Sequence, residues 1–299
     1  MRPKVGSCWY IHICCMRTYI IHPCRCQYTL KARRTQNDIF AVFNLKYRIV
    51  PNQVSPDGGV QRFSDFAEME DDLEKMSMSE HDSYSHVSAA YADILEHALR
   101  STELLGVEME NIKLANDWKS CRKNKWGKQL EQIAKLMKLD TTVLETERAA
   151  FVAKVGGYDT HKTPSIEGAL KILNEGLECF VHELKAQKIF DNTAIVMVSE
   201  FGRSLITNTL SGTDHGWGGH YWLAGGAVKG GQILGKYPEK MKDVDVGRGK
   251  MQPSTPWEGL WNGIGTWWGL DKESMAKILP NAKNFKSGEL LTAKDLFRS

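Results

Sequence analysis

Hydrophobic residues recur with two different patterns in the second half of the chain. Between residues 165 and 188, apolar side chains follow one another at three- and four-residue steps, at Leu170, Leu173, Leu177, Phe180 and Leu184. This spacing places them on one face of an α-helix. The runs 149–155 and 193–198 are instead short, continuous and apolar, which is typical of buried β-strands. Apolar side chains also recur at helical spacing within residues 84–105 and 128–138, and both segments are predicted to be helices.

The order strand, helix, strand over residues 149–198 predicts the fold class. Two buried strands joined by a helix are expected to be parallel strands of one sheet with a right-handed crossover. The chain is therefore predicted to be an α/β protein with a mostly parallel central sheet flanked by helices. In such a sheet the loops that follow residues 155 and 198 leave the same edge, so their side chains should meet there. Earlier in the chain, the apolar patch within residues 38–50 predicts one strand, which Pro51 is expected to end.

Residues 1–37 differ in composition from everything that follows. They contain seven Lys or Arg residues, no Asp or Glu, and five of the seven cysteines. This difference predicts two segments, a basic, cysteine-rich leader at 1–37 and an α/β domain at 38–299. We expect the leader to pack poorly against the domain. Its cysteines lack the paired spacing of a zinc module, and an adjacent Cys14-Cys15 pair does not favour a disulfide framework.

Composition and charge exclude several classes of function. Residues 38–299 carry 32 basic and 36 acidic side chains, so no basic surface for nucleic acid is expected. The apolar stretch at 9–22 contains Arg17 and is too short to span a membrane. Cys179 lies on the predicted buried face of the helix at 165–188, where it is interpreted as a small hydrophobic residue. No convincing signal peptide is present, and the localisation stays open.

Candidate ligands for a metal gather in three glycine-rich runs. These are GGYDTH at 156–161, SEFGR at 199–203 and GTDHGWGGH at 212–220, and the first two follow predicted strands. Carboxylate and imidazole groups on such loops are ligands for divalent metals, here zinc, magnesium, manganese or calcium. We expect at least four of five side chains to converge on one cation or its surroundings, the five being Asp159, His161, Glu200, Asp214 and His215.

Two further residues in these runs have two interpretations each. Arg203 fits either a salt bridge that orients Glu200 or a contact to an anionic substrate. His220 is either a third imidazole ligand or part of an aromatic cluster with Trp217, Tyr221 and Trp222, and packing is slightly favoured. The glycine run at 225–231 does not match a nucleotide-binding loop and is interpreted as a tight turn between strands.

The chain resembles the domain-of-unknown-function family 1501, a relative of the alkaline phosphatase and sulfatase superfamily. The resemblance is strongest over residues 145–299 and looser over 60–140. It rests on five ordered motifs: GGYDTH at 156–161, SEFGRSLITN at 199–208, GTDHGWGGHYWLAGGAVKGGQILG at 212–235, TPWEGLWNGIGTWWG at 255–269 and LPNAKNF at 279–285.

The resemblance implies an alkaline-phosphatase-like sheet with a metal site at the carboxyl ends of its strands. Carried over by motif, Asp159, His161 and His215 would share one metal, and Glu200 would serve a second. Members of the superfamily begin with a strand that carries an aspartate ligand and a hydroxyl nucleophile. That segment is not identified here, so the fold is expected to be incomplete at its N-terminus.

Two hypotheses of function follow. The first is a metal-dependent hydrolase of phosphate or sulfate esters that acts on a small anionic substrate. The second is a catalytically silent metal-binding or structural domain that has lost the nucleophile. A Ser or Thr hydroxyl beside Asp159 and Glu200, or an aspartate or hydroxyl from residues 38–85 at that place, would distinguish them.

Overall fold

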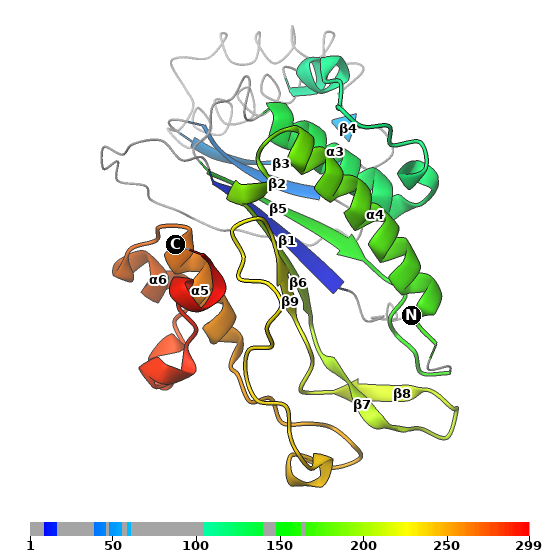
Figure 1. Ribbon diagram of the computed structural model, residues 1–299, viewed down its shortest axis with the longest axis vertical. Coiled ribbons are helices and arrows are strands. Elements are labelled where there is room, and N and C mark those ends of the chain that lie inside the picture. Colours follow the sequence, from blue (N-terminus) through cyan, green and yellow to red (C-terminus); the bar gives the residue numbers. More distant parts are fainter. Residues whose placement is uncertain are drawn as a thin grey trace, which may run out of the picture.

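The computed structural model describes residues 9–16, 39–45, 48–55, 59–60, 105–139, 148–162 and 165–298, and for residues up to 60 it describes the backbone only. Seven strands form one sheet in the order β4-β3-β2-β5-β1-β6-β9 (Figure 1). Their bounds are β1 Trp9–Met16, β2 Ile39–Leu45, β3 Arg48–Ser55, β4 Gly59–Val60, β5 Arg148–Val155, β6 Thr193–Ser199 and β9 Trp222–Ala224. A separate two-stranded ribbon consists of β7 Gly202–Thr207 and β8 Thr213–Gly216.

Helices cover the sheet and make up much of the C-terminal region. The α-helices that lie entirely within the described residues are α3 Lys125–Leu139, α4 Glu167–Ala186, α5 Trp257–Trp267, α6 Lys272–Ile278 and α7 Ala293–Leu296. Short 3-10 helices are η1 Cys121–Lys123, η3 Phe190–Asn192, η4 Met241–Asp243, η5 Ala282–Asn284 and η6 Ser287–Glu289. The structure therefore confirms the helices predicted at 128–138 and 165–188. Of the helix predicted at 84–105, residues 84–104 lie outside the described residues.

The two strands predicted at 149–155 and 193–198 are present as β5 and β6, in one sheet and joined through α4. They are not neighbours, because β1 lies between them and is antiparallel to both. Both strands consequently run in the same direction. Every strand pair in the part of the chain that the structure describes is antiparallel, so the mostly parallel sheet predicted from the sequence is not shown.

The strand between β5 and β6 comes from the segment that was expected to be a poorly packed leader. Residues 9–16 pair along their length with β5 on one side, and residues 9–15 pair with β6 on the other. Residues 9–16 can pair in this way because a strand needs only matching backbone hydrogen bonds on its two edges, whatever the amino-acid composition of the surrounding segment. The single strand expected before Pro51 is likewise a hairpin of β2 and β3, and β3 runs through Pro51 to Ser55.

Two hydrophobic clusters lie on opposite faces of the sheet. On one face, alternate residues of β5 are buried together with the apolar sides of α3 and α4. On the other face, Ala194, Val196 and Val198 of β6 pack with residues of α5 and the C-terminal segment. Strand β6 is thus buried on both faces, which explains why it is continuously apolar and does not alternate. Figure 1 shows the resulting layers, with α3 and α4 on one side and α5 on the other.

Two further links fasten α4 to the segment before α3. Glu183 of α4 is fully buried and accepts hydrogen bonds from the backbone N–H groups of Ala115 and Asn116 at 3.0 and 2.9 Å. Cys179 forms a disulfide with Cys121 of η1, so its interpretation as a small hydrophobic residue is wrong. The disulfide was missed because its cysteines are separated by 58 positions and share no motif.

Among the described residues, none of the helices is long and apolar enough to cross a membrane.

Candidate metal centre

The candidate ligands come from the loop after β5 and from the ribbon of β7 and β8. Both segments leave the same edge of the sheet, because Val155 at the end of β5 and Ser199 at the end of β6 both lie opposite Trp9 of β1. Strand β7 begins at Gly202, three residues after β6 ends, and β8 returns antiparallel to it. The expected meeting of the two loops is therefore present, although it depends on an intervening antiparallel strand and not on parallel neighbours.

Close backbone contact joins the two segments. The N–H group of Thr213 donates to the carbonyl of Thr160 at 2.9 Å, and the two threonine hydroxyls lie 3.2 Å apart. Gly212 makes this approach possible, since a Cβ atom there would lie 2.2 Å from the carbonyl carbon of His161. The sequence needs glycine at this position for steric reasons.

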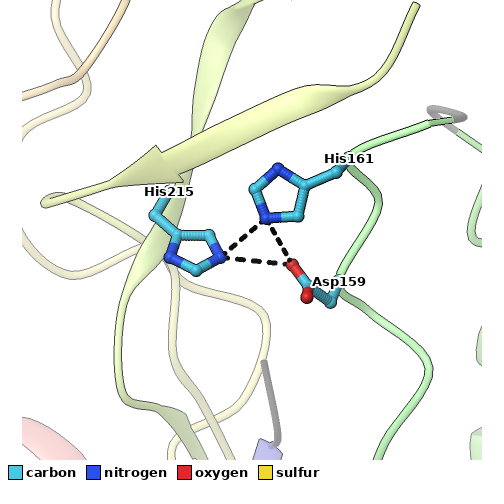
Figure 2. A group of neighbouring side chains, drawn as sticks. All are labelled: Asp159, His161 and His215. Carbon is cyan, nitrogen blue, oxygen red and sulfur yellow. Dashed lines mark hydrogen bonds and ion pairs between the residues drawn. The ribbon is translucent and has the colours of Figure 1, made fainter. Parts of the chain in front are cut away.

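Three side chains bring their ligand atoms together at this contact. The Nε2 atoms of His161 and His215 lie 2.9 Å apart, and each is near Oδ1 of Asp159, at 3.0 and 3.2 Å respectively. Figure 2 shows Asp159 and His161 on the loop and His215 on the ribbon, all pointing toward one place. We call Asp159, His161 and His215 the donor triad. Their side chains are 29%, 39% and 41% exposed, so the place between them can be reached from solvent.

The ring of His215 is held by packing as well as by polar contacts. It stacks on Phe201, with ring centroids 3.8 Å apart and planes inclined by 25°. Phe201 lies between Glu200 and the start of β7, so the motif at 199–203 contributes a support for a ligand ring. Nothing in the sequence around Phe201 indicates this role.

Arg203 of β7 binds the triad's carboxylate. Its Nη1 donates to Oδ1 of Asp159 at 2.9 Å, Nε donates to the hydroxyl of Thr213 at 3.0 Å, and Nη2 donates to the carbonyl of Thr213. Three of the five N–H donors of the guanidinium therefore bind protein groups. Of the two interpretations of Arg203, these contacts favour an orienting salt bridge, and its partner is Asp159 and not the expected Glu200.

These neighbours keep Asp159 ionised. Desolvation on its own would raise the pKa of Asp159, but the hydrogen bond from His215, the charge of His161 and the hydrogen bond from Arg203 together lower it below the ordinary value. The carboxylate is thus present as an anion at neutral pH, which is the form that binds a cation.

Asp214 lies behind the triad and does not point its carboxylate into it. Its Oδ1 is 3.5 Å from Nδ1 of His161, on the opposite side of the ring from Nε2. The hydrogen bond from Asn208 is the main cause that lowers the pKa of Asp214, with a further contribution from His161. In known metal sites, a carboxylate that faces the far ring nitrogen of a histidine ligand orients that ring and is not itself a ligand.

Two of the expected ligands lie outside the donor triad. Glu200 is exposed, and its carboxylate lies 3.4 Å from the hydroxyl of Ser199. His220 is exposed and stacks with Tyr237 at a centroid distance of 5.9 Å, an aromatic partner outside the expected cluster of Trp217, Tyr221 and Trp222. Within the described residues, the structure therefore gathers Asp159, His161 and His215, with Asp214 beside them, and leaves Glu200 and His220 apart.

The donor triad has the composition and spacing of a site for a transition metal. Four-coordinate zinc with bonds of about 2.0–2.1 Å separates its ligand atoms by about 3.3 Å. The three distances in the triad, between 2.9 and 3.2 Å, are within a few tenths of an ångström of that value. Two imidazoles and one carboxylate leave a fourth position for water or substrate, as in catalytic zinc sites.

Comparison with known proteins gives one match. A family described as protein of unknown function (DUF1501) matches residues 33–252. The matched region includes all three members of the donor triad and extends beyond the stretch of strongest resemblance on its N-terminal side. No curated protein and no solved structure matches the chain significantly.

Proposed function

The chain belongs to the DUF1501 family of proteins of unknown function, and from the geometry of its own site we propose that it is a divalent-metal-dependent hydrolase of phosphate or sulfate esters. The observation that carries the proposal is the donor triad, in which three ligand atoms from two separate loops lie within 3.2 Å of one another. The family match covers the triad but names no activity, and the relation to the alkaline phosphatase and sulfatase superfamily is part of this proposal.

The ligand types narrow the choice of metal. Imidazole nitrogen is a good ligand for zinc and for other first-row transition metals, whereas magnesium and calcium prefer sites made of oxygen alone. With two histidines and one aspartate, the triad favours zinc or manganese over magnesium or calcium. A metal of this kind polarises the ester and lowers the pKa of a bound water toward neutrality.

The surrounding residues prepare the triad for such a metal. Arg203 fixes the direction of the Asp159 carboxylate, Phe201 supports the ring of His215, and Asp214 faces the back of His161. These contacts set the positions of the ligands before a metal arrives, which reduces the ordering needed on binding. The three side chains of the triad are partly exposed to solvent, as binding of a small anionic ester requires.

The alternative is a metal-binding domain without catalysis. Two hydroxyls beside the triad, those of Thr160 and Thr213, hydrogen-bond one another, and the Thr213 hydroxyl also accepts from Arg203. Both hydroxyls are thus engaged in structural contacts. Of the segment in which a nucleophile was sought, residues 38–85, the structure describes only part and no side chains.

The experiment combines metal binding with an activity screen. Purified protein, stripped of metal, is titrated with zinc and with manganese and is then assayed with a generic aryl phosphate and an aryl sulfate. We expect one metal per chain and metal-dependent hydrolysis of one ester class. Asp159→Ala and His215→Ala should lose both, while the exposed controls Asp243→Ala in η4 and His182→Ala in α4 should keep both.

Two outcomes would count against the hydrolase hypothesis. Stoichiometric binding without hydrolysis of any tested ester would support the silent domain. Metal binding that is equal in the wild type and in both triad variants would refute the site itself.

A further inference from the structure

Exposed aromatic side chains are concentrated in the stretch of chain that follows His215. Within the described residues, every exposed Trp, Tyr or Phe side chain comes from residues 217–257, at Trp217, Tyr221, Tyr237 and Trp257. Tyr237 stacks on His220, and Tyr221 and Trp257 meet edge to face. Trp217 has no ring partner in the part of the chain that the structure describes, and its side chain is the most exposed of the tryptophans there, at 63%.

The pairing of the ribbon indicates the face to which Trp217 belongs. Arg203 of β7 lies opposite His215 of β8, and opposite residues of two paired strands project from the same face. Both side chains contact the carboxylate of Asp159, so this face of the ribbon is the one that carries the donor triad. Residues two apart along a strand also share a face. Trp217 is the first residue after β8 and lies two positions beyond His215, so the same alternation directs its indole to the side of the triad.

The backbone beside Trp217 is held in place, although the side chain is exposed. The N–H group of Gly218 donates to the carbonyl of Met251 at 2.8 Å. A Cβ atom at Gly202 would lie 1.8 Å from the carbonyl oxygen of Gly218, so the chain after Trp217 packs directly on the start of β7. A tryptophan on a fixed backbone offers a large contact area and loses little conformational freedom when a ligand covers it.

A ring of the substrate is the occupant that suits this position. An ester group at the triad leaves its alcohol part to extend along the same face of the ribbon, past Trp217. The face of an aromatic ring and the C–H face of a sugar ring are both flat and apolar, and both lose contact with water when they lie on an indole. We propose that Trp217 is a specificity-determining residue, whose indole stacks on a ring in the alcohol part of the ester. The proposal rests on the proposed function for the ester group, but stacking is a binding property that is measured without hydrolysis.

The experiment compares ring ligands with open-chain ligands that cannot be hydrolysed. Phosphonates and sulfonates replace the ester oxygen by carbon, and each ring has an open-chain counterpart of similar size and polarity. Benzyl is paired with n-hexyl, and a glucose ring linked through C6 is paired with its open-chain glucitol. Dissociation constants are measured by calorimetry on zinc-loaded protein, and the pair that shows a preference identifies the ring as aromatic or as a sugar.

The expected results depend on the ring at position 217. The wild type should bind one ring ligand about 3- to 10-fold more tightly than its open-chain counterpart, which is the range for one stacked pair of rings. Trp217→Ala should abolish this preference and leave the affinity for the open-chain ligand unchanged, whereas Trp217→Phe should keep most of the preference. The control is Ile233→Ala, which removes an apolar side chain that is 87% exposed and should behave as the wild type.

Several results would overturn the proposal. Equal affinities for ring and open-chain ligands in the wild type would do so, as would a ring preference that survives in Trp217→Ala. A wild-type dimer that dissociates in Trp217→Ala, seen by sedimentation velocity without any ring preference, would show that the indole contacts a second copy of the chain.

Failure of the proposed function is a separate result. If the zinc-loaded wild type hydrolyses no ester but prefers a ring ligand, the hydrolase proposal fails and the role of Trp217 stands. If it hydrolyses ring and open-chain esters with equal kcat/KM and binds both ligands equally, the role of Trp217 fails and the hydrolase proposal stands.

Discussion

The buried carboxylate of Glu183 gives the sharpest prediction about the fold. Glu183 is fully buried on α4, between the helix and the segment before α3. Four donors bind its two oxygens, with Ala115 N–H and Gln187 Nε2 at Oε1 and the N–H and Nδ2 of Asn116 at Oε2. The substitution that tests these contacts is Glu183→Gln, which keeps the side-chain volume and changes one carboxylate oxygen into an NH₂ group.

The magnitude follows from the arrangement of these donors. In either orientation of the amide, the new NH₂ group faces one backbone N–H, of Ala115 or Asn116, which cannot turn away. The side-chain amides of Asn116 and Gln187 can rotate to other partners. A buried donor left without an acceptor costs about 1–3 kcal/mol, and the loss of the charge weakens the bonds that remain. Glu183→Gln should therefore lower the free energy of unfolding by about 2–4 kcal/mol.

The pH dependence has a definite sign. Burial would raise the pKa of Glu183, but the hydrogen bonds from Ala115, Gln187 and Asn116 outweigh it and lower the pKa below its ordinary value of 4.5. A depressed pKa in the folded state adds stability above the unfolded value, and this stability is lost as the pH falls through the folded value. The difference in the free energy of unfolding between wild type and Glu183→Gln should be constant from roughly pH 6 to 8. It should become smaller as the pH falls below the ordinary pKa of glutamate.

Urea denaturation at several pH values measures both effects. The matched control is Glu178→Gln, an exposed position on the same helix, which should change the stability by no more than about 0.5 kcal/mol. If Glu183→Gln and Glu178→Gln have equal effects at neutral pH, the hydrogen-bond argument is wrong. If the difference in the free energy of unfolding between wild type and Glu183→Gln instead grows below the ordinary pKa, the pKa of Glu183 is not lowered by folding.

Two further predictions concern the disulfide and the contact between the site's loops. Reduction of the Cys121–Cys179 disulfide, or its replacement by a pair of serines, should lower the free energy of unfolding by about 4 kcal/mol, because the disulfide closes a loop with a sequence separation of 58. Peptide mapping that finds Cys121 and Cys179 labelled as free thiols in unfolded, unreduced protein would contradict this. Gly212→Ala should push the loop of His161 away from β8 and lower metal affinity by about 10-fold or more. Gly230→Ala, where a Cβ meets no atom within 4 Å, is its control, and equal affinities in the two variants would refute the steric argument.

Local patterns were enough to predict the central elements of the fold. The apolar runs of β5 and β6 and the helical repeat of α4 are each visible within about 20 residues, because burial alone sets their periodicity. The partner of a strand is a different matter, since backbone hydrogen bonds do not depend on side-chain identity. Nothing in the composition of residues 9–16 indicates that they pair between β5 and β6.

The candidate site, like the fold, could be predicted only in part from the sequence. Asp159, His161 and His215 lie in glycine-rich runs, a pattern that the sequence displays, and the structure brings the three together. Glu200 lies in an equally suggestive motif, yet it is apart from the triad, because the ribbon begins at Gly202 and it is the residues of the ribbon that approach the loop after β5. The exposure of Trp217 could be found only from the structure, since tryptophan is highly buried on average.

The central claim is that Asp159, His161 and His215 together bind one divalent metal. The most direct measurement is anomalous X-ray diffraction from crystals of the protein loaded with zinc, with data recorded on both sides of the zinc absorption edge. The account predicts one strong anomalous peak at about 2.0–2.2 Å from Oδ1 of Asp159 and from Nε2 of both histidines. Metal-loaded crystals with no peak between these three atoms, or with the principal peak at other residues, would contradict it.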